Sequence, residues 1–538
     1  MIFRKNRILS LLILSVLTLK FFNLQAVVFG KSYFNAPPPF RPASPELVSI
    51  NRYELEIDHA RRSQFSMMVF GSATVGSDHL ARYLLPNCGQ HTRSNLIAGE
   101  PGCQAANTIH NQLDLQAKYF NVLTAPLPVN GGLYDKSNYQ FQSELTFAPS
   151  RQVFALNFDY RYHISNYLDR GWWVEVVAPL VYAQTNLNME EEIITAGGPN
   201  GNDPNVPEGY FGNMTDAFKQ SGWNYGKIDG KQHRFGFSDL QVRLGYTYAT
   251  EQHYFLKGYF GISVPLSGLP SNEFLFTPDI SSNHFGAFTG YAAGIRVWAK
   301  CEKSIYWLMD TAGTFFFAKN QQRSLDLQGR PWSRYLPVFL SKSATQMNPG
   351  INSLTLPVQV TPDTVRDLNI AFVYKQNGLH VECGYHFYGR GAEKLQLLHN
   401  VDGQLAIASD LEITPSGDVL EYIYRAPASH GGDQYSKDAA NIKTYLQVNN
   451  DQTNVGTMVS GAFVSATDIY LPLTNDDLDL TSGAHPAMIS NTLYGALGYH
   501  WEDLRYPVFA GLGAGYEIGS DDASLHQVLA WGRLDISF

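Results

Sequence analysis

The dominant pattern in this chain is an alternation of apolar and polar positions that recurs from about residue 64 to the last residue. In 153–164 (VFALNFDYRYHI), the even positions carry large apolar side chains such as Phe158, and the odd positions include Asp159 and Arg161. A period of two predicts β-strands with one apolar and one polar face. The runs last about ten to fifteen residues, which suits a tilted transmembrane strand (~9–11) better than a globular sheet (~5–6).

The alternation predicts about fourteen strands, within a range of twelve to sixteen. They cover 64–75, 113–123, 139–147, 151–164, 172–184, 237–250, 253–265, 284–299, 303–318, 366–375, 379–388, 488–501, 505–517 and 524–538. In lipid, only a closed barrel satisfies every backbone group of a sheet. We therefore expect an all-β fold, a single transmembrane antiparallel up-and-down β-barrel over 64–538.

The connections between these strands support the same fold. Counting back from a periplasmic C-terminus, the periplasmic links are short and the outer links are long. The short links are 165–171, 251–252, 300–302, 376–378 and 502–504, and the long links are 76–112, 185–236, 319–365 and 389–487. Bacterial outer-membrane barrels have short periplasmic turns and long outer loops.

The composition fits a protein with an apolar outer surface. The 538 residues include 31 Tyr, 32 Phe and 46 Gly, and aromatic residues make up 13% of the chain. Charged residues make up only 16%, against about 25% in typical soluble domains. No segment after the first 26 residues approaches the ~18 consecutive apolar residues of a transmembrane helix.

The first 26 residues predict a secretory signal peptide, with Arg4, Lys5 and Arg7 before an apolar run and the small Ala26 at its end. Its removal leaves 35 basic and 48 acidic side chains, a net charge of −13. An acidic exported chain is a poor nucleic-acid binder. Residues 27–63 precede the first strand, on the periplasmic side, and are long enough to enter the lumen as a small plug.

The last strand is amphipathic and closes on an aromatic residue. Val528, Leu534 and Ile536 lie on its apolar face, and Phe538 ends the chain. In this the sequence resembles Gram-negative outer-membrane β-barrel proteins. The resemblance implies a place in the outer membrane in contact with its lipid, and a final strand that the barrel-assembly machinery reads as an insertion signal.

The resemblance covers the architecture of nearly all of the mature chain and does not identify a subfamily. In strand number the chain is similar to long-chain fatty-acid and aromatic-hydrocarbon transporters and to a few monomeric porins. Its long loops are similar to those of the major outer-membrane proteins of intracellular bacteria. The oligomeric state stays open.

The polar face of the strands is expected to line the lumen. Its candidate pore-lining residues are Asp159, Arg161, His163, Glu175, Asp239, Arg243, Lys257, Arg296, His380, Glu382, His386, Glu517, Arg533 and Asp535. Because both signs are present, these residues suit a hydrated channel whose selectivity comes from charge placement. The alternative is that they pair with one another and fill the interior.

The longest outer link, 389–487, either folds inward as a constriction or stands outside as a binding surface, because loops of this length are usually functional or disordered. Its acidic residues Asp476, Asp477 and Asp479 do not have the spacing of a known calcium loop. We expect them to be a solvated charge run, and we expect no metal or other cofactor.

The four cysteines divide into two pairs. Cys88 and Cys103 both fall in link 76–112, and in an oxidising compartment we expect a disulfide between them. Cys301 lies in a short turn and Cys383 on an apolar strand face, which is poor geometry for a bridge. We expect both of these to stay reduced.

Two strand features have both a functional and a structural interpretation. Pro179 interrupts a strand that should be paired on both sides, where proline usually marks a bulge. In hydrophobic-molecule transporters such a kink can open a side exit toward lipid. The glycines of 511–515 resemble a phosphate-binding loop only superficially, because they lie in an alternating strand, where inward glycines make room in the barrel.

No nucleophile, metalloprotease or Walker motif is present, so we expect no enzyme. The sequence best fits a porin-like channel for passive diffusion of small hydrophilic solutes, with an infolded loop narrowing a water-filled lumen. There, Arg161, Arg243, Arg296 and Arg533 would oppose Asp159, Glu175 and Glu382. One alternative is a transporter of hydrophobic small molecules, marked by an N-terminal plug and an apolar pocket in the lumen. The other is a surface protein whose loops bind a host partner.

Overall fold

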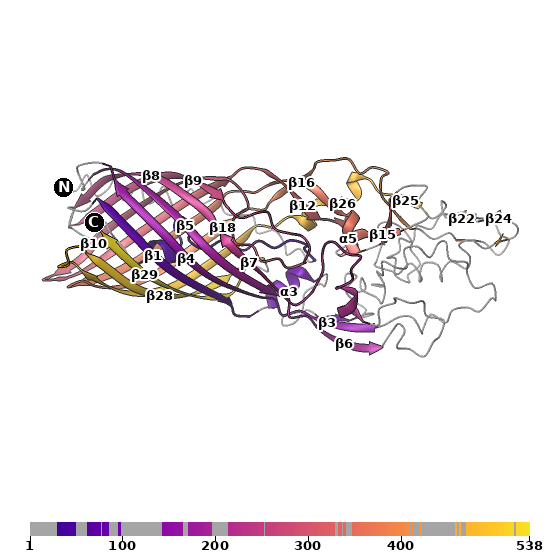
Figure 1. Ribbon diagram of the computed structural model, residues 1–538, viewed down its shortest axis with the longest axis horizontal. Coiled ribbons are helices and arrows are strands. Elements are labelled where there is room, and N and C mark those ends of the chain that lie inside the picture. Colours follow the sequence, from indigo (N-terminus) through magenta and orange to yellow (C-terminus); the bar gives the residue numbers. More distant parts are fainter. Residues whose placement is uncertain are drawn as a thin grey trace.

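The protein is an all-β closed barrel with a folded assembly of loops at one end (Figure 1). The computed structural model describes residues 30–49, 62–76, 78–85, 95–97, 142–164, 170–195, 213–251, 253–328, 332–335, 337–340, 347–408, 412–413, 419–421, 458–459, 462–463, 470–520 and 523–538. No helix in these ranges is long and apolar enough to cross a membrane.

Twelve antiparallel strands close the barrel in the described chain. They are β1 (Ser63–Thr74), β4 (Ser150–His163), β5 (Gly171–Asn186), β8 (Asp239–Glu251), β9 (Tyr254–Pro265), β10 (Gly286–Lys300), β11 (Lys303–Phe316), β17 (Val365–Gln376), β18 (Leu379–Arg390), β27 (Met488–Trp501), β28 (Val508–Gly519) and β29 (Gln527–Ser537). Closure comes from the pairing of β1 with β29, where Phe65 lies opposite Ile536, and from the pairing of β1 with β4. The predicted fold class is confirmed, with a strand number at the lower end of the expected range.

Two of the fourteen predicted strands do not belong to the described barrel. The expected strand at 139–147 is wrong as a barrel strand: β3 (Gln142–Thr146) pairs instead with β2 (Asn95–Ile97) and β6 (Glu190–Thr195) in a separate sheet. β3 has only five residues, too few to cross a bilayer. The expected strand at 113–123 lies outside the described residues.

Short turns gather at the end of the barrel that carries the C-terminus (Figure 1). Between β17 and β18 the turn is Asn377-Gly378, with φ of 48° and 79°. Positive φ at both central residues is the mark of a type I′ hairpin, which Asn-Gly favours. Between β10 and β11 the turn is Cys301-Glu302, with Cys301 at φ 53°. The long links all leave the opposite end, as predicted, and that end is therefore the outer one.

The apolar face of the strands is the outer surface of the barrel. Phe154, Phe260 and Leu512 are 56%, 57% and 71% exposed there. On β4 and β9 most of the alternate residues are buried against the interior. Val528, Leu534, Ile536 and Phe538 of the expected insertion signal are also exposed on the outside. So many large apolar side chains facing outward fit a hydrocarbon environment.

A β-bulge lies opposite Pro179, as expected from the sequence. Leu180 pairs with Phe237 of β7 (Lys231–Phe237), whereas Val177 pairs with Gln241 of β8, so the register shifts by one residue. The backbone N–H of Ser238, between β7 and β8, donates to the carbonyl of Pro179 at 2.9 Å. β7 is therefore the outer continuation of β8, and the wall stays hydrogen-bonded at the kink.

Glycines make room for large inward rings, as predicted for 511–515. A Cβ added to Gly513 would lie 2.3 Å from the ring of Trp531, and one added to Gly245 would lie 2.1 Å from the ring of Trp173. Both positions therefore require glycine because a tryptophan ring lies against the backbone, and not because of the backbone angles.

The remaining short elements belong to the outer links and the N-terminal residues. The strands are β12 (Lys319–Ser324), β13 (Asp326–Leu327), β14 (Pro337–Phe339), β15 (Met347–Pro349), β16 (Thr355–Thr361), β19 (Lys394–Leu397), β20 (Ala406–Ala408), β21 (Glu412–Ile413), β22 (Val419–Glu421), β23 (Met458–Val459), β24 (Ala462–Phe463), β25 (Tyr470–Pro472) and β26 (Leu478–Asp479). The helices are α2 (Pro45–Val48), α3 (Asp78–Leu84), α4 (Met214–Ala217), α5 (Gly350–Ser353) and the 3₁₀ turns η7 (Ser333–Tyr335), η10 (Asn475–Asp477) and η11 (Leu480–Gly483).

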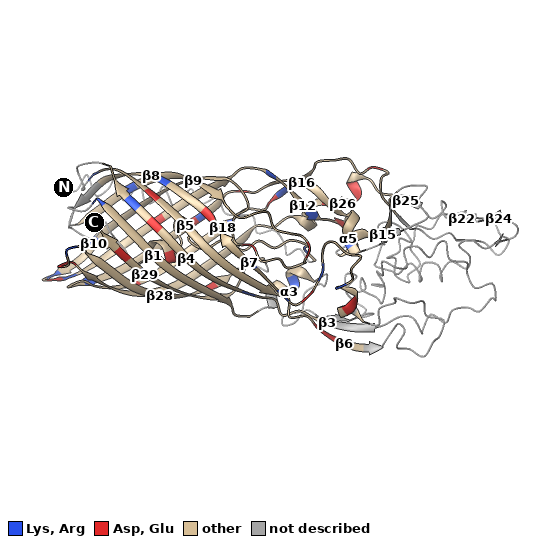
Figure 2. Ribbon diagram, viewed as in Figure 1, with Lys and Arg blue, Asp and Glu red and all other residues tan. Residues whose placement is uncertain are grey.

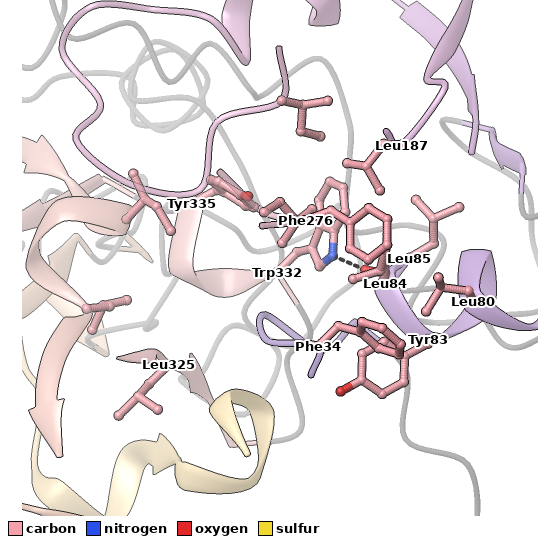
Figure 3. Close-up of a cluster of buried hydrophobic side chains, with 14 of the residues drawn as sticks. Phe34, Leu80, Tyr83, Leu84, Leu85, Leu187, Phe276, Leu325, Trp332 and Tyr335 are labelled. Carbon is pink, nitrogen blue, oxygen red and sulfur yellow. Dashed lines mark hydrogen bonds between the residues drawn. The ribbon is translucent and has the colours of Figure 1, made fainter. Parts of the chain in front are cut away.

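The described parts of the outer links pack together with residues 30–36 around an apolar core, and we call this assembly the cap. Figure 3 shows Phe34, Tyr83, Leu84 and Trp332 converging in that core. Trp332 is fully buried, and its indole N–H donates to the carbonyl of Leu84 at 2.8 Å. Its ring also packs edge-on against Tyr335. The outer end of the barrel is thus covered by a folded structure with its own core.

The acidic residues of link 389–487 lie in turns of the cap. Asp477 accepts hydrogen bonds from Thr474 in a capping box, and Asp479 accepts from Thr481. The described residues contain no cluster of acidic, histidine or cysteine side chains that could hold a metal ion. Cys301 and Cys383 are free and exposed, whereas Cys88 and Cys103 lie outside the described residues.

Phe158→Arg tests which face meets lipid. A charge on the lipid side of β4 should lower the stability of the inserted barrel by about 2–4 kcal/mol. Urea unfolding in lipid vesicles measures the change, and Phe158→Leu is the matched control that keeps the surface apolar. Equal stability of the two variants would mean that this face does not contact hydrocarbon.

Trp332→Ala tests the core of the cap. Truncating a fully buried tryptophan should cost about 3–5 kcal/mol. The loss should fall on the cap, because the rings of Phe147, Phe218 and Tyr335 that pack against Trp332 lie outside the barrel strands. Limited proteolysis in detergent should then cleave the outer links faster, while Trp332→Phe retains most of the protection. Unchanged cleavage would contradict a packed cap.

Candidate functional site: an occupied lumen

The inner wall of the barrel carries the charged residues that the sequence singled out (Figure 2). The following are buried on the inward face: Asp159, His163, Glu175, Asp239, Arg243, Lys257, His380, Glu382, His386, Glu517, Arg533 and Asp535. Arg161 lies beside them, with its side chain 16% exposed. Arg296 is different, because it lies near the periplasmic end of β10 and contacts His253 of the turn before β9.

Glu175 is the centre of a buried ion-pair cluster. Its carboxylate oxygens accept from Arg161 Nη2 at 2.7 Å and from Arg243 Nη1 at 3.1 Å. The Arg161 guanidinium also lies 4.9 Å from the centre of the Trp173 ring. The strands on either side of β5, β4 and β8, therefore each supply one arginine to Glu175. These three charges largely neutralise one another.

A second buried cluster is formed around Arg533 on β29. Its Nε lies 2.9 Å from Asp535, and its Nη2 lies 4.0 Å from Asp159. Glu382 on β18 instead accepts a hydrogen bond from the hydroxyl of Tyr494 at 2.8 Å. The expected opposition of arginines and acidic residues is thus present for Arg161, Arg243 and Arg533, but not for Arg296.

Residues 30–49, the N-terminal segment, run from the cap into the space inside this wall. Phe40 is fully buried and packs against Phe70 of β1, with ring centres 5.8 Å apart. Arg41 Nε donates to Asp367 of β17 at 3.1 Å, and its guanidinium lies 4.5 Å from the centre of the Tyr388 ring. Asp367 also contacts His386 at 2.9 Å.

Inward side chains of the barrel wall donate hydrogen bonds to oxygen atoms of the N-terminal segment at several positions between the outer end and the middle of the lumen. Arg390 Nη2 donates to the carbonyl of Asn35 at 3.1 Å, and Gln241 Nε2 donates to the carbonyl of Phe40 at 2.8 Å. Arg390 is the last residue of β18 and Gln241 the third residue of β8, so both lie toward the outer ends of their strands.

Deeper in the barrel, two neighbouring residues of β29 make the same kind of contact. Arg533 Nη1 donates to the carbonyl of Leu47 at 2.7 Å, and Trp531 Nε1 donates to the hydroxyl of Ser49 at 2.9 Å. The segment therefore follows the lumen from the cap toward the periplasmic end.

The outer end of the segment is anchored in the cap. The hydroxyl of Tyr33 donates to Asp279 at 3.1 Å, and Arg334 donates both to Asp326 and to the carbonyl of Gly30. Burial raises the pKa of Asp279 to about 6, although nearby arginines oppose the shift. Burial likewise raises the pKa of Asp326 to about 6 against the effect of Arg334.

Two small cavities lie beside the segment in the part of the chain that the structure describes. The outer one, of about 50 Å³, lies between the prolines at 38, 39 and 42 and the rings of Phe288, Phe316 and Tyr388, with Asp239, His284 and Arg390 among its polar lining residues. The inner one, of about 30 Å³, lies between Leu47 and the charged residues around Glu175. A cavity needs at least ~10–15 Å³ to hold one water, so each has room for a few waters only.

Sequence reasoning missed Arg41, Asp367, Arg390 and Trp531, which hold the segment. The length of 27–63 was the signal that a small plug could enter the lumen. The partners could not be read from the pattern, because each contact joins residues that are far apart in the chain.

Solved outer-membrane channels are similar to this chain. An outer-membrane channel from Pseudomonas putida F1 is 8% identical, with a TM-score of 0.34, over 89% of this chain and 96% of that chain. The CymD monoaromatic hydrocarbon channel is 10% identical, with a TM-score of 0.27, over 93% and 94%. A FadL homologue from Pseudomonas aeruginosa is 7% identical, with a TM-score of 0.27, over 95% and 96%.

No protein-family model matches the chain, and no curated protein matches it. Identities and TM-scores this low carry no functional conclusion. The closed barrel with its apolar outer face is nonetheless the fold of Gram-negative outer-membrane β-barrel proteins, and its place is the outer membrane.

Glu175→Gln tests the buried ion-pair cluster. The change leaves Arg161 and Arg243 without their carboxylate, which should cost about 3–5 kcal/mol. The matched control is Glu502→Gln, which removes the ion pair between Glu502 and Lys375. The Glu502 side chain is 55% exposed, so this change should cost at most about 1 kcal/mol. Urea unfolding in lipid vesicles compares the two, and a cost for Glu175→Gln no larger than the control's would contradict the cluster's role.

Proposed function

We propose that the protein is a gated outer-membrane channel for small hydrophobic molecules, closed at rest by its N-terminal segment. The observation that carries the proposal is the occupied lumen: the N-terminal segment contacts the inner wall from Asn35 to Ser49. A porin for free diffusion needs a continuous water-filled passage, which does not fit this arrangement.

The outer cavity supports a hydrophobic cargo. Its wall includes three prolines of the segment and the rings of Phe288, Phe316 and Tyr388. Ligand sites for small molecules are mostly apolar, with a few polar groups that fix orientation. A plug in the lumen next to a largely apolar cavity is the pair of features that separates a hydrophobic-molecule transporter from a porin.

The segment would have to move for transport to occur. Its polar contacts with the wall are single hydrogen bonds and one ion pair, each worth about 0.5–3 kcal/mol, and Phe40 adds ring packing against Phe70. None of these is a continuous strand pairing with the wall. If Arg41 moves away, Asp367 of the wall still has His386 as a partner. Segment release therefore leaves few buried charges uncompensated.

Planar-bilayer recording tests the closed state. The full-length protein should show no large conductance steps, because the segment fills the lumen. A variant lacking residues 36–49 should show them, and Arg41→Met, which removes one anchor but keeps the segment, should open briefly and often. Large steady steps from the full-length protein would contradict the proposal and favour the porin.

Whole-cell uptake tests the cargo. Cells that make the protein should take up toluene several-fold faster than cells that make a variant lacking the whole barrel, residues 64–538. Sucrose uptake should not differ between the two. Faster sucrose uptake would favour a hydrophilic channel. No effect on either solute would favour a surface protein whose cap binds a partner.

A further inference from the structure

The four wall donors that hold the N-terminal segment form a series along the lumen. Arg390 is the last residue of β18 at the outer end, Gln241 lies near the outer end of β8, and Trp531 and Arg533 lie deeper on β29. All four residues are at least nine-tenths buried. Each donates to an oxygen of the segment, at 2.7–3.1 Å.

Gln241 and Trp531 differ from the arginines of the wall, because Arg533 also has Asp535 as a partner on its own strand. Arg161 and Arg243 have Glu175 as a fixed partner on the barrel itself, so they do not depend on the segment. The amide N–H of Gln241 and the indole N–H of Trp531 instead meet the segment, while Gln241 Oε1 accepts from Arg243 at 2.7 Å and is held in position by it. When the segment leaves, these donors keep their orientation and lose their acceptor.

A buried donor without an acceptor costs about 1–3 kcal/mol, so a molecule that follows the lumen is favoured if it brings an oxygen. We propose that the channel selects small apolar molecules that carry a carbonyl-type oxygen acceptor over hydrocarbons of the same shape. The oxygen takes the place of the segment's acceptor oxygens, which are the Phe40 carbonyl at Gln241, the Ser49 hydroxyl at Trp531 and the Leu47 carbonyl at Arg533. This inference rests on the proposed function and specifies the substrate class within it.

The cavities are consistent with such a path. The outer cavity borders both Gln241 and Arg390 and presents aromatic rings beside them. The inner cavity borders Arg533. Apolar surface for the body of the molecule and a donor for its oxygen therefore occur together near the outer end, and a donor recurs at the next cavity along the lumen.

The test compares acetophenone with ethylbenzene, which have nearly the same shape and differ by one carbonyl oxygen. Protein-dependent uptake is measured in whole cells after subtraction of uptake by cells that lack the protein. We expect acetophenone to enter at least about tenfold faster, the factor that corresponds to about 1.4 kcal/mol. In Gln241→Met the preference should fall at least about threefold, with ethylbenzene uptake unchanged.

Trp531→Phe provides a second variant, because it removes the indole N–H and keeps an aromatic ring against Gly513. It should lower the preference in the same direction if Gln241→Met fails to insert. Equal uptake of the two compounds by the unaltered protein, or a preference that neither variant lowers, would overturn the inference while leaving a hydrophobic-molecule channel intact. Uptake of neither compound would overturn the proposed function and the inference together.

Discussion

A hydrogen-bond donor fixed on the wall of a narrow lumen must find an acceptor, and this constraint governs the interior of the protein. Two kinds of solution occur side by side. Some donors, such as Arg161 and Arg243, are matched by Glu175 on the same wall. Others, such as Gln241 and Trp531, are matched by oxygens of a separate piece of chain. The first kind stabilises the barrel permanently, and the second kind links the state of the lumen to the position of the N-terminal segment.

The size of the barrel makes this arrangement workable. Eight-stranded barrels have interiors that side chains can fill, and barrels of 16–18 strands leave an aqueous channel. Twelve strands lie between these cases, and the lumen here holds inward side chains together with one stretch of chain that contains a single helical turn, α2. The cap then covers the outer end with a core of its own, to which Phe34 of the segment contributes. One segment thus joins the cap to the deep lumen.

Much of the barrel follows from the sequence because its signals are local. Period-two alternation identified every strand of the closed barrel, and the short link 376–378 and Pro179 marked a tight turn and a bulge where the structure has them. The strand expected at 139–147 was wrong because a short alternating run does not reveal which sheet it joins. The inward position of residues such as Glu175 could be predicted, whereas its two arginine partners were two among several candidates. The anchors of the segment could not be predicted, since contacts such as Arg41 with Asp367 join positions hundreds of residues apart.

Amide hydrogen exchange in the folded, detergent-solubilised protein tests most directly whether the segment occupies the lumen. The backbone N–H of Phe40 donates to Glu46, and those of Leu47, Val48 and Ser49 donate within the turn around α2, all inside the barrel. Peptides covering 40–49 should therefore exchange slowly, on the timescale of the barrel strands β27 and β28. Exchange of these amides within seconds, as in a free peptide, while the strands stay protected, would show that the lumen is not closed by this segment.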